Sequence, residues 1–279
     1  MKNMIYPCLW FDKNAKEAAE FYCSVFTDSV ITAENPMVVS FESEGQKFMC
    51  LNGGPQFMFN PSTSFFVLYE NREELDKAWQ SLSEGGSELM PLDSYEWSDR
   101  YGWVQDKFGV SWQLYLGRMQ DVGQKFSLSF LFTGAQNGKA GQALEFYTSV
   151  FDDSGVSGIL KYAQGENEVE GNVKHAQFHL GDHVFMATDS TMEHPFSFNE
   201  AISLVVDCET QDEIDYYWDK LTDGGEESQC GWLKDKFGVS WQIVPAILGK
   251  LMSDPSRSQR VIHAFMQMKK FDIEKLVNA

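Results

Sequence analysis

Basic residues are scarce in this chain. Of its 279 residues, only 22 are Lys or Arg, whereas 41 are Asp or Glu, and the formal net charge is −19. A charge of this size and sign repels nucleic-acid phosphates and anionic lipid headgroups. We therefore expect no nucleic-acid partner and no membrane partner.

Long apolar runs and a regular cysteine pattern are also missing from the sequence. No apolar run approaches the roughly 18 residues of a membrane span, and residues 1–14 become charged too early for a secretory signal. The five Cys are odd in number and form no CxxC pair, so we expect reduced thiols. These features together predict a cytoplasmic protein.

Aromatic residues, in contrast, are abundant, with 22 Phe, 10 Tyr and 8 Trp. This content suits packed cores and also apolar pockets for small molecules. The length of the chain favours two domains over one.

The two halves of the sequence repeat each other. The segment GWVQDKFGVSWQL at 102–114 returns as GWLKDKFGVSWQI at 231–243, with ten of thirteen positions identical. Upstream segments recur in the same order, such as EAAEFYCSVFTDS at 17–29 and QALEFYTSVFDDS at 142–154. A whole domain has therefore been duplicated.

This duplication predicts domain A at 1–119 and domain B at 125–279. Domain A holds an extra segment, SELMPLDSYEWSDRY, at 87–101, before its final hairpin. Domain B ends in a tail of helical character at about 246–279 that domain A lacks.

Hydrophobic periodicity predicts the same series of elements in each domain. In domain A we expect strands at 5–11, 37–43, 46–52 and 64–70, helices at 14–26 and 72–82, and a hairpin at 102–115. Asp106 and Asp235 are turn residues in this interpretation. Alternation along the last strand turns Trp112 toward the helices and Gln113 to the other face, and Trp241 and Gln242 repeat the pattern.

Long phrases of the sequence resemble the PhnB-like branch of the vicinal oxygen chelate superfamily, which includes glyoxalase I, extradiol dioxygenases and bleomycin-resistance proteins. The resemblance covers nearly the whole chain and is carried by PCLWFDKNAKEAAEFYCSVF, GQKFMCLNGGPQFMFNPSTSFFV and CGWLKDKFGVSWQIVP. The branch is often labelled 3-demethylubiquinone-9 3-methyltransferase. The resemblance implies an α+β fold of tandem glyoxalase-like domains, each built of two βαβββ modules that form a cupped mixed sheet, with the helical tail added.

The resemblance also implies positions for a divalent metal, held by four inward side chains. Carried across, these positions fall on Pro7, Cys50, Ser64 and Gln113 in domain A. In domain B they fall near Phe130 and on Ala187, Ser203 and Gln242. No carboxylate or imidazole is among them, so we predict no metal and no other cofactor.

All five His lie in domain B, and HAQFHLGDH at 175–183 groups three of them. One interpretation is a solvated sheet edge. The other is a new metal or acid–base site, for which His179 and His183 are the candidates.

Two other groups of side chains leave alternatives open. Cys8, Cys50 and Cys230 are core or pocket residues, or else reactive thiols. Gln113 and Gln242 either orient a ligand or bond a neighbouring strand. Methyl transfer from S-adenosylmethionine would require a doubly wound sheet with a glycine-rich first turn, which the sequence does not offer.

We therefore predict a metal-independent protein that binds a small apolar molecule in an aromatic cup. The residues expected to bind it are Trp10, Phe41, Cys50, Asn52, Phe57, Gln113 and Gln242. The alternatives are an enzyme of lyase, dioxygenase or transferase type, with a methyltransferase less favoured, and an interaction module without a pocket. The Met and Phe stripe of the tail covers a sheet edge or the other domain, or it contributes to a homodimer, since this superfamily commonly pairs its modules.

Overall fold

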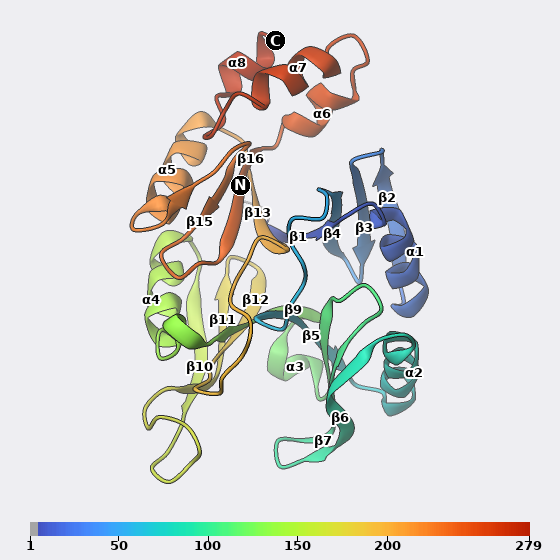
Figure 1. Cartoon of the computed structure of the whole chain (residues 1–279), viewed down its shortest axis with the longest axis vertical. Helices are drawn as coiled ribbons and strands as arrows, with labels where there is room; N and C mark the ends of the chain where they lie inside the picture. The colour runs from blue at the N-terminus through green and yellow to red at the C-terminus, as the bar shows by residue number, and fades with distance from the viewer. Residues whose placement is uncertain (1–4) are drawn as a thin grey trace. The chain divides into compact units, whose positions relative to one another are not determined.

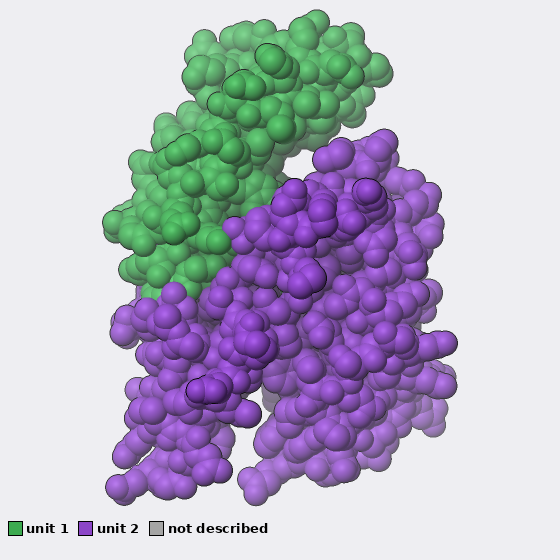
Figure 2. Space-filling model, viewed as in Figure 1, with its two compact units in different colours: residues 1–8, 202–279 green, residues 9–201 purple. Residues whose placement is uncertain are grey.

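The computed structural model describes residues 5–279 (Figure 1). The chain forms two compact units, shown in separate colours in Figure 2. Among the described residues, unit 1 comprises 5–8 and 202–279, and unit 2 comprises 9–201. Strand β1 (Ile5–Phe11) is divided between the two.

Unit 2 opens with the first βαβββ module. Its elements after β1 are α1 (Ala15–Val25), β2 (Ser29–Glu34), β3 (Val38–Ser43) and β4 (Gln46–Asn52). The three strands pair antiparallel, and α1 buries Ala15, Ala18, Ala19 and Tyr22. The spacing of these buried residues is that of one helix face. Phe41 of β3 stacks on Phe48 of β4 at 4.7 Å and contacts Tyr22 at 6.1 Å, so the core of this module lies beneath α1.

An eight-stranded mixed sheet fills the rest of unit 2. Its elements are β5 (Thr63–Tyr69), α2 (Arg72–Ser83), β6 (Ser87–Tyr95), β7 (Ser98–Gln105), β8 (Ser111–Leu116), α3 (Met119–Val122), β9 (Phe126–Phe132), η1 (Gly134–Gln136), α4 (Ala140–Val150), β10 (Gly155–Lys161), β11 (Val173–Leu180) and β12 (His183–Asp189). The strand order is β10-β11-β12-β9-β5-β8-β7-β6. Parallel pairs join β5 to β8 and β12 to β9, whereas β5 and β9 run antiparallel.

The pairing of β5 with β9 joins a module of domain A to a module of domain B. The predicted α+β class, the tandem modules and their mixed sheets are confirmed. The limits 1–119 and 125–279 describe the sequence repeat, whereas the compact units follow the pairing of modules across it. Whether each repeat is an independent domain stays a prediction.

Unit 1 contains the last module and the tail. Its elements are β13 (Ile202–Cys208), α5 (Gln211–Thr222), β14 (Glu226–Glu227), β15 (Trp232–Lys234), β16 (Ser240–Pro245), α6 (Leu248–Ser253), α7 (Ser258–Phe265) and α8 (Ile273–Val277). Helix α5 begins with a capping box between Thr210 and Glu213. The short tail helices agree with the predicted helical tail, and Met268 O accepts a hydrogen bond from Cys230 N within this unit.

Within residues 5–279, no helix is both long and apolar enough to cross a membrane.

Candidate functional site

A buried aspartate holds the turn of the repeated hairpin. Asp106 Oδ1 accepts from the backbone N–H groups of Phe108 (2.8 Å) and Val110 (3.0 Å). Its Oδ2 accepts from Trp112 Nε1 (2.8 Å) and from the hydroxyl of Tyr22 on α1 (2.9 Å). Burial raises the pKa of Asp106, and these four donors oppose that shift.

Asp235 repeats this arrangement in unit 1, with Phe237 N, Val239 N and Trp241 Nε1 as donors at 2.9, 3.1 and 2.9 Å. The two aspartates were expected as turn residues, and they also bind the indole of the following strand. The recurring D-x-x-G-V-S-W spacing is the sequence signal for this contact.

The predicted alternation of β8 is confirmed. Trp112 is 1% exposed and contacts Tyr22 of α1 and Phe26 directly after that helix. Gln113 lies on the opposite face and is partly exposed. We call the face of the unit 2 sheet that carries Gln113 the cup face, because helices α1 and α2 pack on the other side.

Gln113 is held in one orientation at the centre of the cup face. Its Nε2 donates to Ser64 Oγ of β5 at 2.6 Å, and its Oε1 accepts from the hydroxyl of Tyr101 of β7 at 2.8 Å. Burial raises the pKa of Tyr101, so this hydroxyl stays protonated and donates.

The row of polar side chains continues onto β9. Ser64 pairs with Ser129, and Phe66 pairs with Ser127, so both serines share the cup face. The Ser127 hydroxyl is fully buried and has no hydrogen-bond partner. A buried hydroxyl without a partner costs free energy, which a bound polar group would recover.

Apolar side chains surround this polar row. Phe66 and Tyr115 lie 5.2 Å apart between ring centroids. The buried members of the cluster are Phe66, Leu68, Tyr101, Val122 and Met186, and partly buried Met90, Tyr95, Trp103, Tyr115, Met119 and Val184 pack against them. Helix α3, which lies beside β5 in Figure 1, supplies Met119 and Val122 and therefore covers part of the cup.

Four of the predicted metal-binding residues lie on the wrong face of their strands. In each case a residue next to it in the sequence occupies the predicted position instead. Phe130 and Ala187 lie on the face that packs against α4, as the stacking of Phe130 on Phe185 shows. Ser129 and Met186, which pair with each other, occupy the cup face instead.

The same one-residue shift applies to the first module. Cys50 lies on the face of Phe48, toward α1, so Met49 takes the opposite face. Cys8, rather than Pro7, contacts Ser203 and Gln242 of unit 1.

The corrected residues do not fit a divalent metal. Ser64, Gln113, Ser129 and Met186 in unit 2 are all neutral, and Gln242 Nε2 of unit 1 donates to Ser203 Oγ at 2.9 Å in the same pattern. Burial raises the pKa of Cys8 to about 12, which keeps its thiol protonated. Among residues 5–279, no group of His, Cys, Asp and Glu is arranged to hold a metal ion.

The other predicted ligand residues lie apart from Gln113. Trp10 contacts Phe57 edge-on at 5.0 Å and donates to Gly54 O. Asn52 Oδ1 accepts from Ala15 N at the start of α1. Phe41 and Cys50 are buried beneath α1, and Gln242 belongs to unit 1. The ligand-binding role of these residues stays a prediction.

The histidine candidates point away from each other. His179 shares its face with Val184, its partner in register, whereas His183 pairs with Leu180 and follows the alternate face. These two imidazoles therefore do not form one site.

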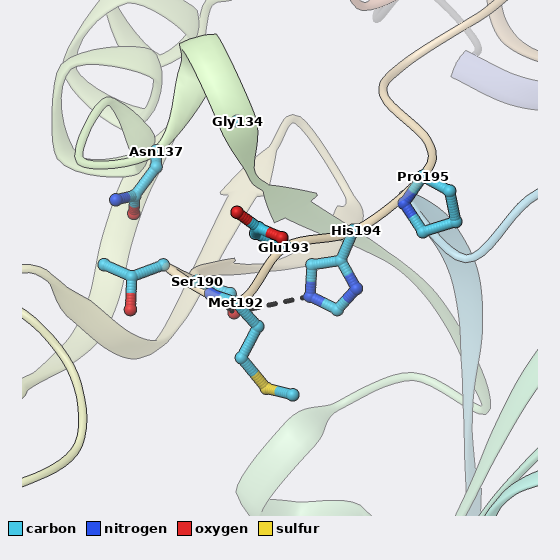
Figure 3. A pocket seen from close by; sticks show the side chains of 8 residues that line it. Gly134, Asn137, Ser190, Met192, Glu193, His194 and Pro195 are labelled. Carbon is cyan, nitrogen blue, oxygen red and sulfur yellow. Dashed lines mark hydrogen bonds between the residues drawn. The ribbon is translucent and has the colours of Figure 1, made fainter.

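A pocket of about 500 Å³ lies after β12 (Figure 3). Its lining residues are Gly134, Asn137, Ser190, Thr191, Met192, Glu193, His194 and Pro195. Ser190 Oγ lies 3.4 Å from His194 Nε2, 3.2 Å from Glu168 Oε1 and 3.3 Å from Met192 N. The hydroxyl is thus held within the loop by three partners. Sequence reasoning did not single out this pocket.

Comparison with known proteins agrees with this architecture. The family model described as 3-demethylubiquinone-9 3-methyltransferase matches residues 3–115 and 124–244. A comparison with curated proteins gives no match.

Two solved structures illustrate the likeness. A putative 3-demethylubiquinone-9 3-methyltransferase, PhnB protein, from Bacillus cereus is 36% identical over 40% of this chain and 98% of its own, with a TM-score of 0.38. Glyoxalase I from Zea mays is 9% identical over 95% of this chain and 98% of its own, with a TM-score of 0.58, which shows a shared fold. The chain therefore belongs to the PhnB-like 3-demethylubiquinone-9 3-methyltransferase family and has two tandem glyoxalase-type domains.

Proposed function

We propose that the cup face of unit 2 binds a small, mainly apolar molecule without the help of a metal ion. The observation that carries the proposal is Gln113, a partly exposed amide fixed in orientation among aromatic side chains. An apolar surface with few and well-placed polar groups is the composition typical of small-molecule sites.

The hydrogen bonds of Gln113 leave capacity for a ligand. A glutamine amide offers two N–H donors and a carbonyl oxygen with two lone pairs. Ser64 accepts from one N–H, and Tyr101 donates to one lone pair. One donor and one acceptor therefore remain, so Gln113 suits a ligand with a hydroxyl, amine or carbonyl group.

The four neutral side chains at the metal positions of the cup argue against Lewis-acid chemistry at those positions. Ser64, Gln113, Ser129 and Met186 present no anionic ligand, and such a set holds hard divalent ions weakly. Binding, rather than activation of the ligand by a metal, is the function that these groups support.

The test is a fluorescence titration with N-phenyl-1-naphthylamine, an apolar probe with one N–H group. We expect saturable binding to the wild-type protein and a dissociation constant about tenfold higher in Gln113→Leu, because one hydrogen bond contributes about 1.4 kcal/mol. Tyr101→Phe removes the hydroxyl that orients the amide and keeps the ring, so we expect a smaller increase.

Gln242→Leu is the matched control, because Gln242 makes the same bond to a serine but lies in unit 1. It should leave the dissociation constant unchanged, provided that each variant keeps the wild-type melting temperature within a few degrees. Equal affinity of wild type and Gln113→Leu would refute the proposed site, and a loss in Gln242→Leu alone would move it to unit 1.

We also propose that the protein is cytoplasmic and forms a homodimer. We propose that it has neither a nucleic-acid partner nor a membrane partner. The net charge of −19 supports the last two exclusions. Sedimentation would give the assembly state, and cell fractionation the location.

A further inference from the structure

Three aromatic rings gather at the hairpin that only domain A carries. Tyr95 and Trp97 stack with ring centroids 5.0 Å apart and an interplanar angle of 21°. Tyr101 meets both rings edge-on, at 5.7 Å from Tyr95 and 5.9 Å from Trp97. Because the Tyr101 hydroxyl donates to Gln113, this aromatic cluster is continuous with the cup.

Trp97 leaves much of its ring open to solvent. The side chain is 56% exposed, although it is large and apolar. An exposed indole that is held by neighbouring rings is typical of a recognition surface, because its contact area is rigid before a ligand arrives. The open face of an indole carries negative electrostatic potential and attracts cations.

Carboxylates accompany the rings along the same hairpin. Asp93, Glu96 and Asp99 are all exposed, and Asp93 pairs in register with Tyr101. The neighbouring Arg100 binds Asp76 of α2 at 2.8 Å. Within the described part of the chain, none of these three carboxylates takes part in an ion pair. The rim of the cup is therefore both aromatic and negatively charged.

We propose that the aromatic cluster binds the positive end of an organic ammonium ligand whose apolar body lies in the cup. This inference rests on the proposed function of the cup. A quaternary ammonium group is weakly hydrated and suits an aromatic face, whereas a small inorganic cation keeps its water. The net charge of −19 draws such cations toward the protein.

The test compares N,N,N-trimethyl-1-naphthylammonium with 1-tert-butylnaphthalene, which has the same shape and no charge. Each compound competes with N-phenyl-1-naphthylamine on the whole protein. We expect the ammonium compound to bind about tenfold more tightly than its neutral counterpart. Trp97→Ala should reduce that ratio to about one. The triple variant Asp93→Asn, Glu96→Gln and Asp99→Asn should lower the ratio and its dependence on salt.

Tyr216→Ala is the control, because Tyr216 is an exposed aromatic residue on α5 of unit 1, and it should change nothing. Equal affinity for the two compounds overturns this proposal and leaves the cup intact, since the probe is still bound. A preference that survives Trp97→Ala overturns it as well.

If N-phenyl-1-naphthylamine did not bind, the proposed function would be refuted. Binding of the ammonium group to the aromatic cluster could still be tested. In that case, quenching of tryptophan fluorescence by the ammonium compound decides the proposal. Quenching in wild type that disappears in Trp97→Phe supports it, and identical quenching in both overturns it.

Discussion

At the residue scale, Asp106 connects three parts of unit 2. One carboxylate accepts bonds from the hairpin turn, from Trp112 of β8 and from Tyr22 of α1. It is 4% exposed, so its partners have no water to replace it. Asp106 therefore stabilises the turn and also connects β8 to α1 through hydrogen bonds.

Asp106→Asn should lower the free energy of unfolding by about 2–4 kcal/mol, because an amide cannot accept from all four donors. Chemical denaturation of the variant measures the loss. Asp152→Asn, at an exposed position after α4, is the control and should change stability by less than about 0.5 kcal/mol. A similarly small effect of Asp106→Asn would show that the buried bonds contribute little.

The five thiols should fall into two groups by reactivity. Cys8, Cys50 and Cys208 are fully buried, and burial raises the pKa of Cys8 to about 12. Cys23 and Cys230 are partly exposed. At about pH 8, iodoacetamide should modify Cys23 and Cys230 in the native protein and the other three only after unfolding. Mass spectrometry of the alkylated chain checks this, and rapid labelling of Cys8 would be the opposite result.

At the element scale, the sequence predicted the strands and helices better than the faces of some strands. In β8, polar and apolar residues alternate, and the positions of Trp112 and Gln113 are confirmed. Strand β1 reads as an almost continuous apolar run that is buried on both sides, so its residues carry no signal for face. An error of one residue in the alignment then assigns each side chain to the wrong face, as it did for Pro7.

Strand β9 did carry the missing signal. Ser127 and Ser129 alternate with Phe and Leu in FSLSFLF, and this pattern places both serines on the cup face. The position of Phe130 could therefore have been corrected from the sequence. The bond from Tyr101 to Gln113 could not be predicted, because Tyr101 is the last residue of the extra segment, which has no counterpart in domain B.

A pair of glycines follows each of the helices α2 and α5, and the second glycine of each pair has a steric explanation. A Cβ on Gly86 would lie 2.3 Å from Gln105 O, and one on Gly225 would lie 2.1 Å from Lys234 O. The chain after α2 therefore runs directly against the end of β7, and the chain after α5 against the end of β15.

Gly86→Ala and Gly225→Ala should each cost about 1–3 kcal/mol of stability, because backbone must move to admit the methyl group. Thermal unfolding of each variant measures the cost. Gly158→Ala on β10 is the control, since its added Cβ meets nothing within 4 Å. If all three variants had the same melting temperature, the close approach of the glycine to the strand backbone would not constrain the turn.

At the scale of the whole molecule, the sequence repeat does not reveal which modules share a sheet. Two nearly equivalent halves permit pairing within a half or across halves. The structure shows the latter in unit 2, where β5 of domain A pairs with β9 of domain B. Contacts between residues distant in sequence determine which modules pair, and a repeat pattern does not indicate those contacts.

A fragment of residues 1–119 should therefore not unfold cooperatively as a monomer. Separation would leave the β5 backbone at Thr63–Val67 without its β9 partner, and such an edge favours association. Mixing with residues 120–279 should restore a cooperative transition, which circular dichroism and sedimentation would record. A stable monomeric fragment would instead support independent domains at 1–119 and 125–279.

Metal-independent binding by the cup face is the property on which the proposed function depends. The most direct measurement is a titration of N-phenyl-1-naphthylamine into untagged protein that has been stripped with chelator, before and after addition of zinc or nickel. We expect one dissociation constant, unchanged within about twofold by stripping or by added metal. Binding that disappears on stripping and returns with the metal would contradict this expectation and would make a metal-dependent enzyme the better explanation.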